Sequence, residues 1–226
     1  MIKKIIQVSV LLALAGVAEA SPVFTDTVIT GDSSIQNSGV TVSANNLGNG
    51  ASGATVNGVA FGNNQSGLSS NFYNGGGDFS TDPFSSGLDS LLSSLVFAGN
   101  WNPATLTIGG LTIGQAYSLQ LLFSNDVNST GNNVTVGVQG SQYQFTNWQP
   151  SARDLIVDFV ADSTFVTTTF TPISGNEAGR AVLNAYALQT ASSVSTAAVP
   201  EPASLALMAL GLVGIAGVGK KRTVSK

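Results

Sequence analysis

The 226-residue sequence contains no cysteine and no histidine. Without cysteine the chain forms no disulfide, and it has neither a thiol nucleophile nor thiolate metal ligands. Without histidine it lacks the commonest general base, the serine–histidine–aspartate triad and the usual zinc ligand. We therefore expect a protein that is not an enzyme and that holds no cofactor, apart from the structural calcium considered below.

Charged residues are also scarce, at 9% of the chain, and the basic ones are concentrated near its two ends. Between residues 21 and 199 the only basic residues are Arg153 and Arg180, against nine aspartates and one glutamate, which gives a net charge of −8. Such a surface repels phosphate backbones. We therefore expect no nucleic-acid partner.

The first twenty residues have the pattern of a secretory signal peptide. Lys3 and Lys4 are followed by an apolar run, Val8–Ala18, that only Ser9 interrupts. Ala18 and Ala20 flank Glu19 in the small-x-small pattern that signal peptidase cleaves. The pattern predicts export and cleavage after Ala20. An uncleaved anchor is the alternative, but the apolar run is short for a membrane span.

The end of the sequence has three consecutive parts. Pro200, Glu201 and Pro202 form an extended, accessible peptide, because proline removes a backbone donor and restricts its neighbour. The uncharged segment 203–219 follows and would span roughly 25 Å as a helix, at the short end for a bilayer core. Its alternative is a buried core helix. The basic residues Lys220, Lys221 and Arg222 come next, as expected on the cytoplasmic side of a transmembrane helix.

Residues 199–222 resemble the PEP-CTERM sorting signal of bacterial exported proteins. The resemblance implies that a membrane-embedded exosortase recognises Pro200, Glu201 and Pro202 and processes the tail, residues 200–226. It also implies a link to exopolysaccharide, biofilm and cell-surface material. The expected location is outside the cell, anchored in the membrane by the C-terminal helix or released to the surface or matrix.

The part between the two ends, residues 21–190, is predicted to be one exported domain, joined to the tail by a Ser/Ala/Thr linker at 191–199. Short runs with period-two hydrophobicity and regular turn signals predict a mainly β, antiparallel jelly-roll-like sandwich. One short helix is expected at 88–97, because leucines recur there at helical spacing. A long loop is expected at 62–87. Strands are expected at 24–29, 40–43, 106–108, 117–123, 134–138, 155–159, 166–170 and 181–188, with a strand or hairpin at 55–61.

The segments Leu106–Phe123 and Ala181–Leu188 resemble jelly-roll modules of the galactose-binding-like type. The resemblance implies that a final strand returns beside the central strands. Many such modules bind carbohydrate, so the resemblance also implies a carbohydrate ligand.

Three aromatic residues are candidates for ligand contact: Trp101, Trp148 and Tyr143. Sugar rings stack on exposed aromatic side chains, and neighbouring asparagines supply hydrogen bonds to hydroxyl groups. The alternative is that these rings fill the ends of the sandwich.

Two groups of aspartates bear on the question of a metal site. Asp78 and Asp82 lie in the glycine-rich loop, where oxygen ligands suit a structural calcium ion. Asp154, Asp158 and Asp162 are four residues apart, so neighbours on a strand are about 13 Å apart and do not share one ion. We interpret these three as solvated strand positions.

These observations favour an exported cell-surface or exopolysaccharide-matrix protein with weak carbohydrate binding. Its expected partners are signal peptidase, an exosortase-like enzyme, the membrane and extracellular polysaccharide. Two alternatives stay open. One is a purely structural or adhesive surface subunit without a small ligand. The other is an extracellular glycan hydrolase, which needs two carboxylates about 5–10 Å apart.

Overall fold

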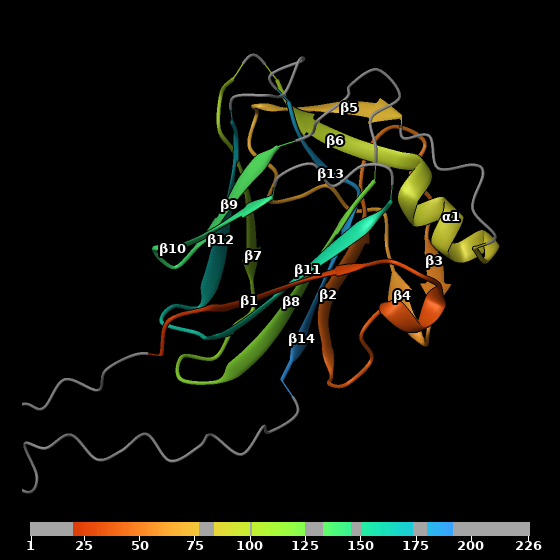
Figure 1. The fold of residues 1–226 in the computed structure, drawn as a ribbon. Helices are drawn as coiled ribbons and strands as arrows, with labels where there is room; N and C mark the ends of the chain where they lie inside the picture. Colours follow the sequence, from red (N-terminus) through yellow and green to blue (C-terminus); the bar gives the residue numbers. More distant parts are fainter. Residues whose placement is uncertain are drawn as a thin grey trace, which may run out of the picture. The chain divides into compact units, whose positions relative to one another are not determined.

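Two antiparallel sheets lie face to face and form the body of the molecule (Figure 1). The computed structural model describes residues 20–76, 84–99, 101–124, 133–145, 151–173 and 180–191. All of them belong to one compact unit, Glu19–Ser193. Of the predicted signal peptide only Ala20 is described, and the predicted tail, residues 200–226, lies outside the described residues. Among the residues that are described, no helix has the length and hydrophobicity needed to cross a membrane.

The first sheet has five strands, and its inner face is apolar. They are β1 (Val23–Val28), β2 (Thr41–Asn46), β8 (Ala116–Phe123), β11 (Arg153–Val160) and β14 (Ala185–Thr190). Their order in the sheet is β1-β11-β8-β14-β2, and all neighbours are antiparallel. β14 therefore lies between β8 and β2, which confirms the expectation that a final strand returns beside the central ones.

The second sheet has four strands with a strict alternation of side chains. They are β7 (Ala104–Gly109), β9 (Val134–Val138), β10 (Ser141–Phe145) and β12 (Phe165–Pro172), in the order β10-β9-β12-β7. Val134, Val136 and Val138 are buried, whereas Thr135 and Gly137 between them are partly exposed. One face of this sheet therefore packs in the core, and the other faces outward.

The main hydrophobic core lies between the two sheets. The ring of Phe123 from the first sheet lies 4.9 Å from Phe145 and 6.5 Å from Phe170 of the second sheet, measured between centroids. Leu119 and Leu121 are fully buried beside them. Burying a side chain of this size contributes about 1.5–3 kcal/mol. The packing confirms the predicted antiparallel sandwich.

A small third sheet stands at one end of the sandwich (Figure 1). It consists of β5 (Phe72–Gly76), β6 (Ser94–Ala98) and β13 (Ala181–Leu183), in the order β13-β6-β5. Phe72 meets Phe170 of the main core edge to face, with centroids 5.7 Å apart. The expectation of an uninterrupted loop at 62–87 is wrong, because β5 forms within it and pairs with β6.

A second, smaller core lies on the outer face of the five-stranded sheet. It is formed by helix α1 (Ser86–Ser93), the hairpin of β3 (Ala54–Val56) and β4 (Val59–Phe61), and the segment 29–35. The hairpin confirms the sequence expectation: Asn57 and Gly58 have φ angles of 46° and 79°, as a two-residue type I′ turn requires. The segment 29–35 contains a single 3₁₀ turn, η1 (Asp32–Ser34).

The predicted helix at 88–97 is right in its first half and wrong in its second. Leu88, Leu91 and Leu92 are fully buried on one face of α1. The helix ends at Ser93, and the chain continues directly as β6. β-branched and aromatic side chains favour a strand there, and pairing with β5 and β13 supplies the backbone hydrogen bonds.

Candidate functional site

The outward side of the four-stranded sheet carries no ionisable side chain and is rich in threonine. We call this surface the threonine face. Cross-strand pairing aligns its residues in rows: Thr107 is opposite Thr167, and Thr169 lies between Thr105 and Gly137. The hydroxyl oxygens of Thr107 and Thr167 are 3.1 Å apart. The face consists of Thr105, Thr107 and Gly109 of β7, Thr135 and Gly137 of β9, Gln142 and Gln144 of β10, and Thr167, Thr169 and Thr171 of β12.

Two adjoining hollows open at one end of the threonine face. The smaller has a volume of about 280 Å³ and the larger about 390 Å³. Gln139 and Thr167 line both, so the hollows form one continuous depression. The smaller is floored by Gly137 and Thr169, whereas the larger is bordered by Asp162 and Phe165.

Gln139 stands in an unusual backbone conformation at this depression. It begins the two-residue turn between β9 and β10 with φ 45°, and Gly140 follows with φ 77°. Glycine and asparagine are the residues that such a turn prefers, and another side chain there is uncommon. The Gln139 side-chain amide donates a hydrogen bond of 3.0 Å to the Val160 carbonyl at the end of β11. The turn is thereby connected to the neighbouring β11–β12 loop.

Phe165 is an exposed aromatic residue at the rim of the larger hollow. Half of its surface, 50%, is accessible to solvent. It is opposite Gly109 in the sheet, and the space beside Gly109 is open. Asp162 and Ser163 precede it in the β11–β12 loop. The depression therefore combines an exposed ring with carboxylate, amide and hydroxyl groups. Sequence analysis missed it because only the fold brings residues 137–142 to residues 162–169.

The aromatic residues singled out from the sequence lie elsewhere. Trp101 is 52% exposed and has φ 62° in the turn before β7. Tyr143 is half-buried in β10. Because β7 and β10 are opposite edges of the sheet, the structure does not bring these two residues together. Trp148, Asp78 and Asp82 lie outside the described residues.

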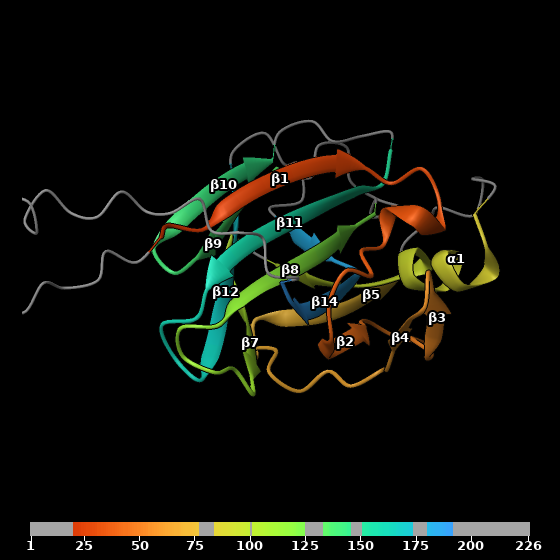
Figure 2. The same ribbon diagram turned by 90° about the horizontal axis from the view of Figure 1, so that it is seen from below.

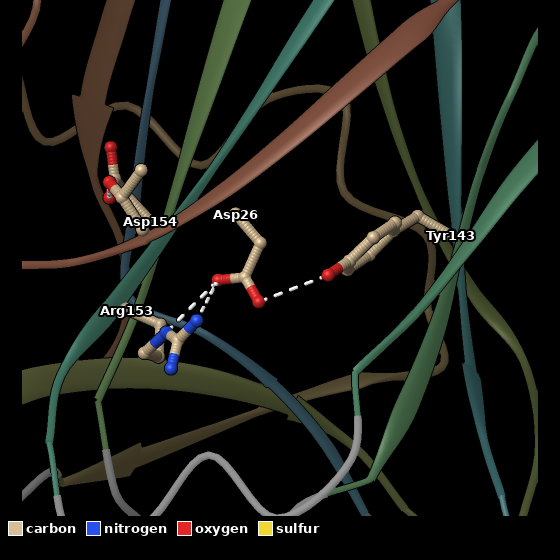
Figure 3. A network of polar contacts seen from close by, with 5 residues as sticks. Asp26, Tyr143, Arg153 and Asp154 are labelled. Atoms are coloured by element: carbon tan, nitrogen blue, oxygen red, sulfur yellow. Dashed lines mark hydrogen bonds and ion pairs between the residues drawn. The ribbon is translucent and has the colours of Figure 1, made fainter.

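Tyr143 takes part in a polar network at the edge where β1 and β10 run side by side (Figure 2). Its hydroxyl donates to one Asp26 carboxylate oxygen at 3.0 Å. Arg153 contacts the other oxygen with Nη2 at 2.7 Å and Nε at 3.0 Å. Figure 3 shows the Asp26 carboxylate between the two partners. Burial, followed by the hydrogen bond and negative charge of Asp26, raises the pKa of Tyr143. We call Asp26, Tyr143 and Arg153 the seam network, because they join the two sheets.

The interpretation of Asp154, Asp158 and Asp162 as solvated strand positions is wrong for Asp154. Asp158 and Asp162 are exposed as expected, but Asp154 is only 1% exposed. It accepts hydrogen bonds from the Thr27 hydroxyl and, at 2.7 Å, from the Gln120 amide. Burial is the largest influence on Asp154 and raises the pKa of its carboxyl, although these two hydrogen bonds lower it.

Asp154 is buried because the segment 30–40 covers this part of the five-stranded sheet. The segment is fixed by two glutamines of the sheet: Gln120 pairs with the backbone of Ser34 and Gln36, and Gln189 with the backbone of Gln36 and Ser38. These groups are therefore used to hold the fold. Among the described residues, no three or more acidic side chains gather as a metal site would require.

Comparison with known proteins identifies the tail and the fold separately. A family model described as the PEP-CTERM protein-sorting motif matches residues 198–222. The tail therefore carries a PEP-CTERM sorting motif, and this motif implies export, exosortase processing and sorting to the bacterial cell surface. No curated protein matches the sequence.

The sandwich resembles extracellular domains of plant receptor-like kinases. The receptor-like kinase FER superposes with a TM-score of 0.53 and 16% identity over 66% of this chain. The ANXUR1 extracellular domain from Arabidopsis thaliana gives 0.52 and 17% over 66%. A complex of the plant peptide RALF23 with FER and LLG2 gives 0.54 and 14% over 74%. The chain spans 41% of the first two structures and 54% of the third. At these identities the likeness concerns the fold.

Proposed function

We propose that the protein is a non-enzymatic component of the bacterial cell surface or exopolysaccharide matrix. The signal peptide exports it, the C-terminal helix holds it in the membrane, and exosortase processing then releases or re-anchors the sandwich domain. The domain contributes to the matrix by weak binding of polysaccharide. The observation that carries the proposal is the PEP-CTERM motif at 198–222.

The fold supports the proposal that the domain acts outside the cell. The similar solved structures include extracellular domains of receptor-like kinases. The domain has two hydrophobic cores and needs no disulfide. The buried carboxyl group of Asp154 and the buried amide groups of Gln120 and Gln189 are hydrogen-bonded within the fold. A rigid scaffold with a separate, exposed binding surface is what a matrix component requires.

A binding role is favoured over the two alternatives. A purely structural subunit would present a flat surface without exposed aromatic rings, but the threonine face is hollowed and Phe165 and Trp101 are exposed. A glycan hydrolase needs two available carboxylates at a cleft. Asp26 and Asp154 are committed to partners in the fold, and Asp162 is the one acidic residue lining the larger hollow.

The sorting part of the proposal is tested by replacing Pro200, Glu201 and Pro202 with alanine in the full chain. Because the exosortase is expected to recognise this motif, we expect the variant to stay in the membrane fraction, whereas the unaltered chain reaches the surface or medium. The matched control replaces Ser195 and Thr196 of the linker with alanine and is expected to be sorted normally. Equal release of the motif variant would refute exosortase sorting.

A further inference from the structure

We propose that the depression on the threonine face is the binding site for a neutral polysaccharide chain, with Phe165 as its stacking platform. The inference rests on the proposed matrix function and assigns it to named residues. The site extends from Phe165 across Gln139 and Thr167 to Gly137 and Gln142.

The first argument is the combination of groups. The apolar face of a pyranose ring packs on an aromatic ring, and its hydroxyls need donors and acceptors around the edge. Phe165 supplies the ring, half exposed at the rim. Asp162, Gln139 and Thr167 line the same hollow and supply an acceptor carboxylate, an amide and a hydroxyl. A hydrocarbon ligand would cover the Asp162 carboxylate and the Gln139 amide oxygen without offering them a hydrogen bond, so a polyhydroxylated ligand fits better.

The second argument is the shape of the depression. The two hollows share Gln139 and Thr167 and continue along the face. At Gly137 the sheet has no side chain, and an added Cβ would lie 3.7 Å or more from its neighbours. The absence of a side chain there keeps the smaller hollow open. Two adjoining hollows suit consecutive units of a polymer rather than a single compact ligand.

The third argument is the backbone of Gln139. Its left-handed backbone conformation is disfavoured for residues other than glycine, asparagine and aspartate. Residues in such disfavoured backbone conformations concentrate at functional sites. Asparagine would suit the turn better, but its shorter side chain would not reach as far. Gln139 reaches the Val160 carbonyl and lines both hollows. A long side chain thus occupies a position where the turn itself favours a shorter one.

The fourth argument is charge. The strands of the threonine face contain no aspartate, glutamate, lysine or arginine, and Asp162 is the one charged residue lining the two hollows. Residues 21–199 have a net charge of −8. Like charges repel, so an anionic polymer is disfavoured and a neutral one is selected.

The test is affinity electrophoresis of the full chain in a polyoxyethylene detergent, because a detergent with a sugar headgroup would compete for the site. The gels contain dextran, a soluble mixed-linkage β-glucan or, as the anionic comparison, alginate. We expect a neutral polysaccharide to retard the protein and alginate to have little effect. Phe165→Ala should weaken the association at least about tenfold. Gln139→Asn and Gly137→Val should weaken it as well, the first by shortening a side chain and the second by filling the smaller hollow.

Tyr73→Ala is the matched control. Tyr73 is 51% exposed, like Phe165, but it lies on β5 and packs beside Phe97 away from the depression. We expect it to bind like the unaltered chain. Thermal unfolding of each variant verifies that the fold is kept.

Four outcomes would overturn the site. If the unaltered chain is not retarded by either neutral polysaccharide, the binding part of the proposed function fails with it, while the sorting experiment stands independently. If the chain is retarded and Phe165→Ala is retarded equally, binding occurs elsewhere. If Tyr73→Ala alone loses binding, the third sheet carries the ligand. If Phe165→Ala instead lowers the oligomeric mass in light scattering, the face joins copies of the chain.

Discussion

Asn184 shows how much of the fold depends on single buried amides. It is the single residue between β13 and β14, and it is completely buried. Its side-chain oxygen accepts from the Ser124 backbone amide at 2.6 Å. Its side-chain nitrogen donates to the carbonyls of Leu92 and Ser94 and to the Ser124 hydroxyl. One side chain thereby connects helix α1, the third sheet and the end of β8.

We predict that Asn184→Ala lowers the free energy of unfolding by about 2–4 kcal/mol. The substitution leaves the buried Ser124 amide without the Asn184 oxygen, and an orphaned buried polar group costs about 1–3 kcal/mol. Urea denaturation measures the change. The control is Asn71→Ala, since Asn71 is exposed and donates one bond to the Pro103 carbonyl. A loss no larger than that of the control would contradict the role of Asn184.

Asp154 makes the stability of the domain depend on pH. Burial raises its pKa above the ordinary value of 3.8, so the folded domain binds this proton more tightly than the unfolded chain does. The contribution of Asp154 to stability is therefore fully present below about pH 4 and is lost as the pH rises through the raised pKa.

We predict that Asp154→Asn flattens this part of the pH dependence. Asparagine remains able to accept from Gln120 and can donate to the Thr27 oxygen, so both contacts are kept. Thermal unfolding of the two proteins from pH 3.5 to 8 gives the comparison. The stability difference should change in favour of the variant as the pH rises. A constant difference across the range would mean that Asp154 does not titrate with folding.

The sequence predicted the alternation on β11 but not the burial of Asp154. Leu155, Val157 and Phe159 face the main core as expected. An aspartate on the other face of β11 is expected to be exposed to solvent, unless a further layer of the structure covers that face. That layer comes from residues 30–40, more than a hundred positions away, and no local pattern indicates it. The depression beside Phe165 was missed for the same reason.

At the scale of elements, helix α1 depends on the residue that immediately precedes it. Ser85 caps the helix: its side-chain oxygen accepts from the Leu88 amide at 3.2 Å. The same hydroxyl donates to the Asp32 carboxylate at 2.7 Å, which ties the helix to η1. The helix has only 8 residues, and isolated helices of that length are not stable in water. Capping and packing on the second core therefore decide whether it forms.

We predict that Ser85→Ala destabilises the domain by about 1–2 kcal/mol, through loss of the cap and of the contact with Asp32. Ser93→Ala at the other end of the helix is the control, with an expected change of a few tenths of a kcal/mol. Chemical denaturation of both variants measures the difference. Equal effects of the two substitutions would show that the cap is not what stabilises the helix.

The sequence predicts the boundaries of strands well where the turn between them requires particular residue types. Asn57-Gly58 indicated the hairpin of β3 and β4, because few residues adopt two consecutive positive φ angles. Boundaries failed where long-range pairing decides. Leu95 continues the helical spacing of Leu88, Leu91 and Leu92, but pairing with Gly75 of β5 makes it part of strand β6. The glycine-rich strand β5 resembles a loop until its partner is known.

At the scale of the whole molecule, the seam network closes one edge of the sandwich. Phe24 stacks on Tyr143 with centroids 5.9 Å apart, and the Asp26 carboxylate lies between Tyr143 and Arg153 (Figure 3). Asp26 and Arg153 are on β1 and β11 of one sheet, and Tyr143 is on β10 of the other. Their contacts connect the edges of two sheets that are separate in the part of the chain that the structure describes.

We predict a coupling free energy of about 1 kcal/mol between Asp26 and Tyr143 in a double-mutant cycle. The cycle compares Asp26→Leu, Tyr143→Phe and the double variant by urea denaturation. Leucine is close to aspartate in size and has no acceptor, and phenylalanine lacks the hydroxyl donor, so each single variant removes the hydrogen bond. Strictly additive effects would show that the seam is held by the aromatic contact alone.

The sandwich and the tail were both foreseeable at this scale, for different reasons. Alternating runs indicated the β architecture, because period-two hydrophobicity follows directly from strand geometry. The tail was identified because Pro200–Pro202, an apolar segment and a basic end follow one another without a gap. The proposed ligand surface has no such linear signature, since Gly137, Gln139 and Phe165 meet only across the folded sheet.

The most direct test of the central claim is the intact mass of the protein recovered from the surface of its native cells. We expect a chain that begins at Ser21 and ends between Val199 and Pro202, or that carries an added group there, because signal peptidase and the exosortase remove the two ends. A mass that retains Ala203–Lys226 would mean that the tail is a plain membrane anchor and would contradict exosortase sorting.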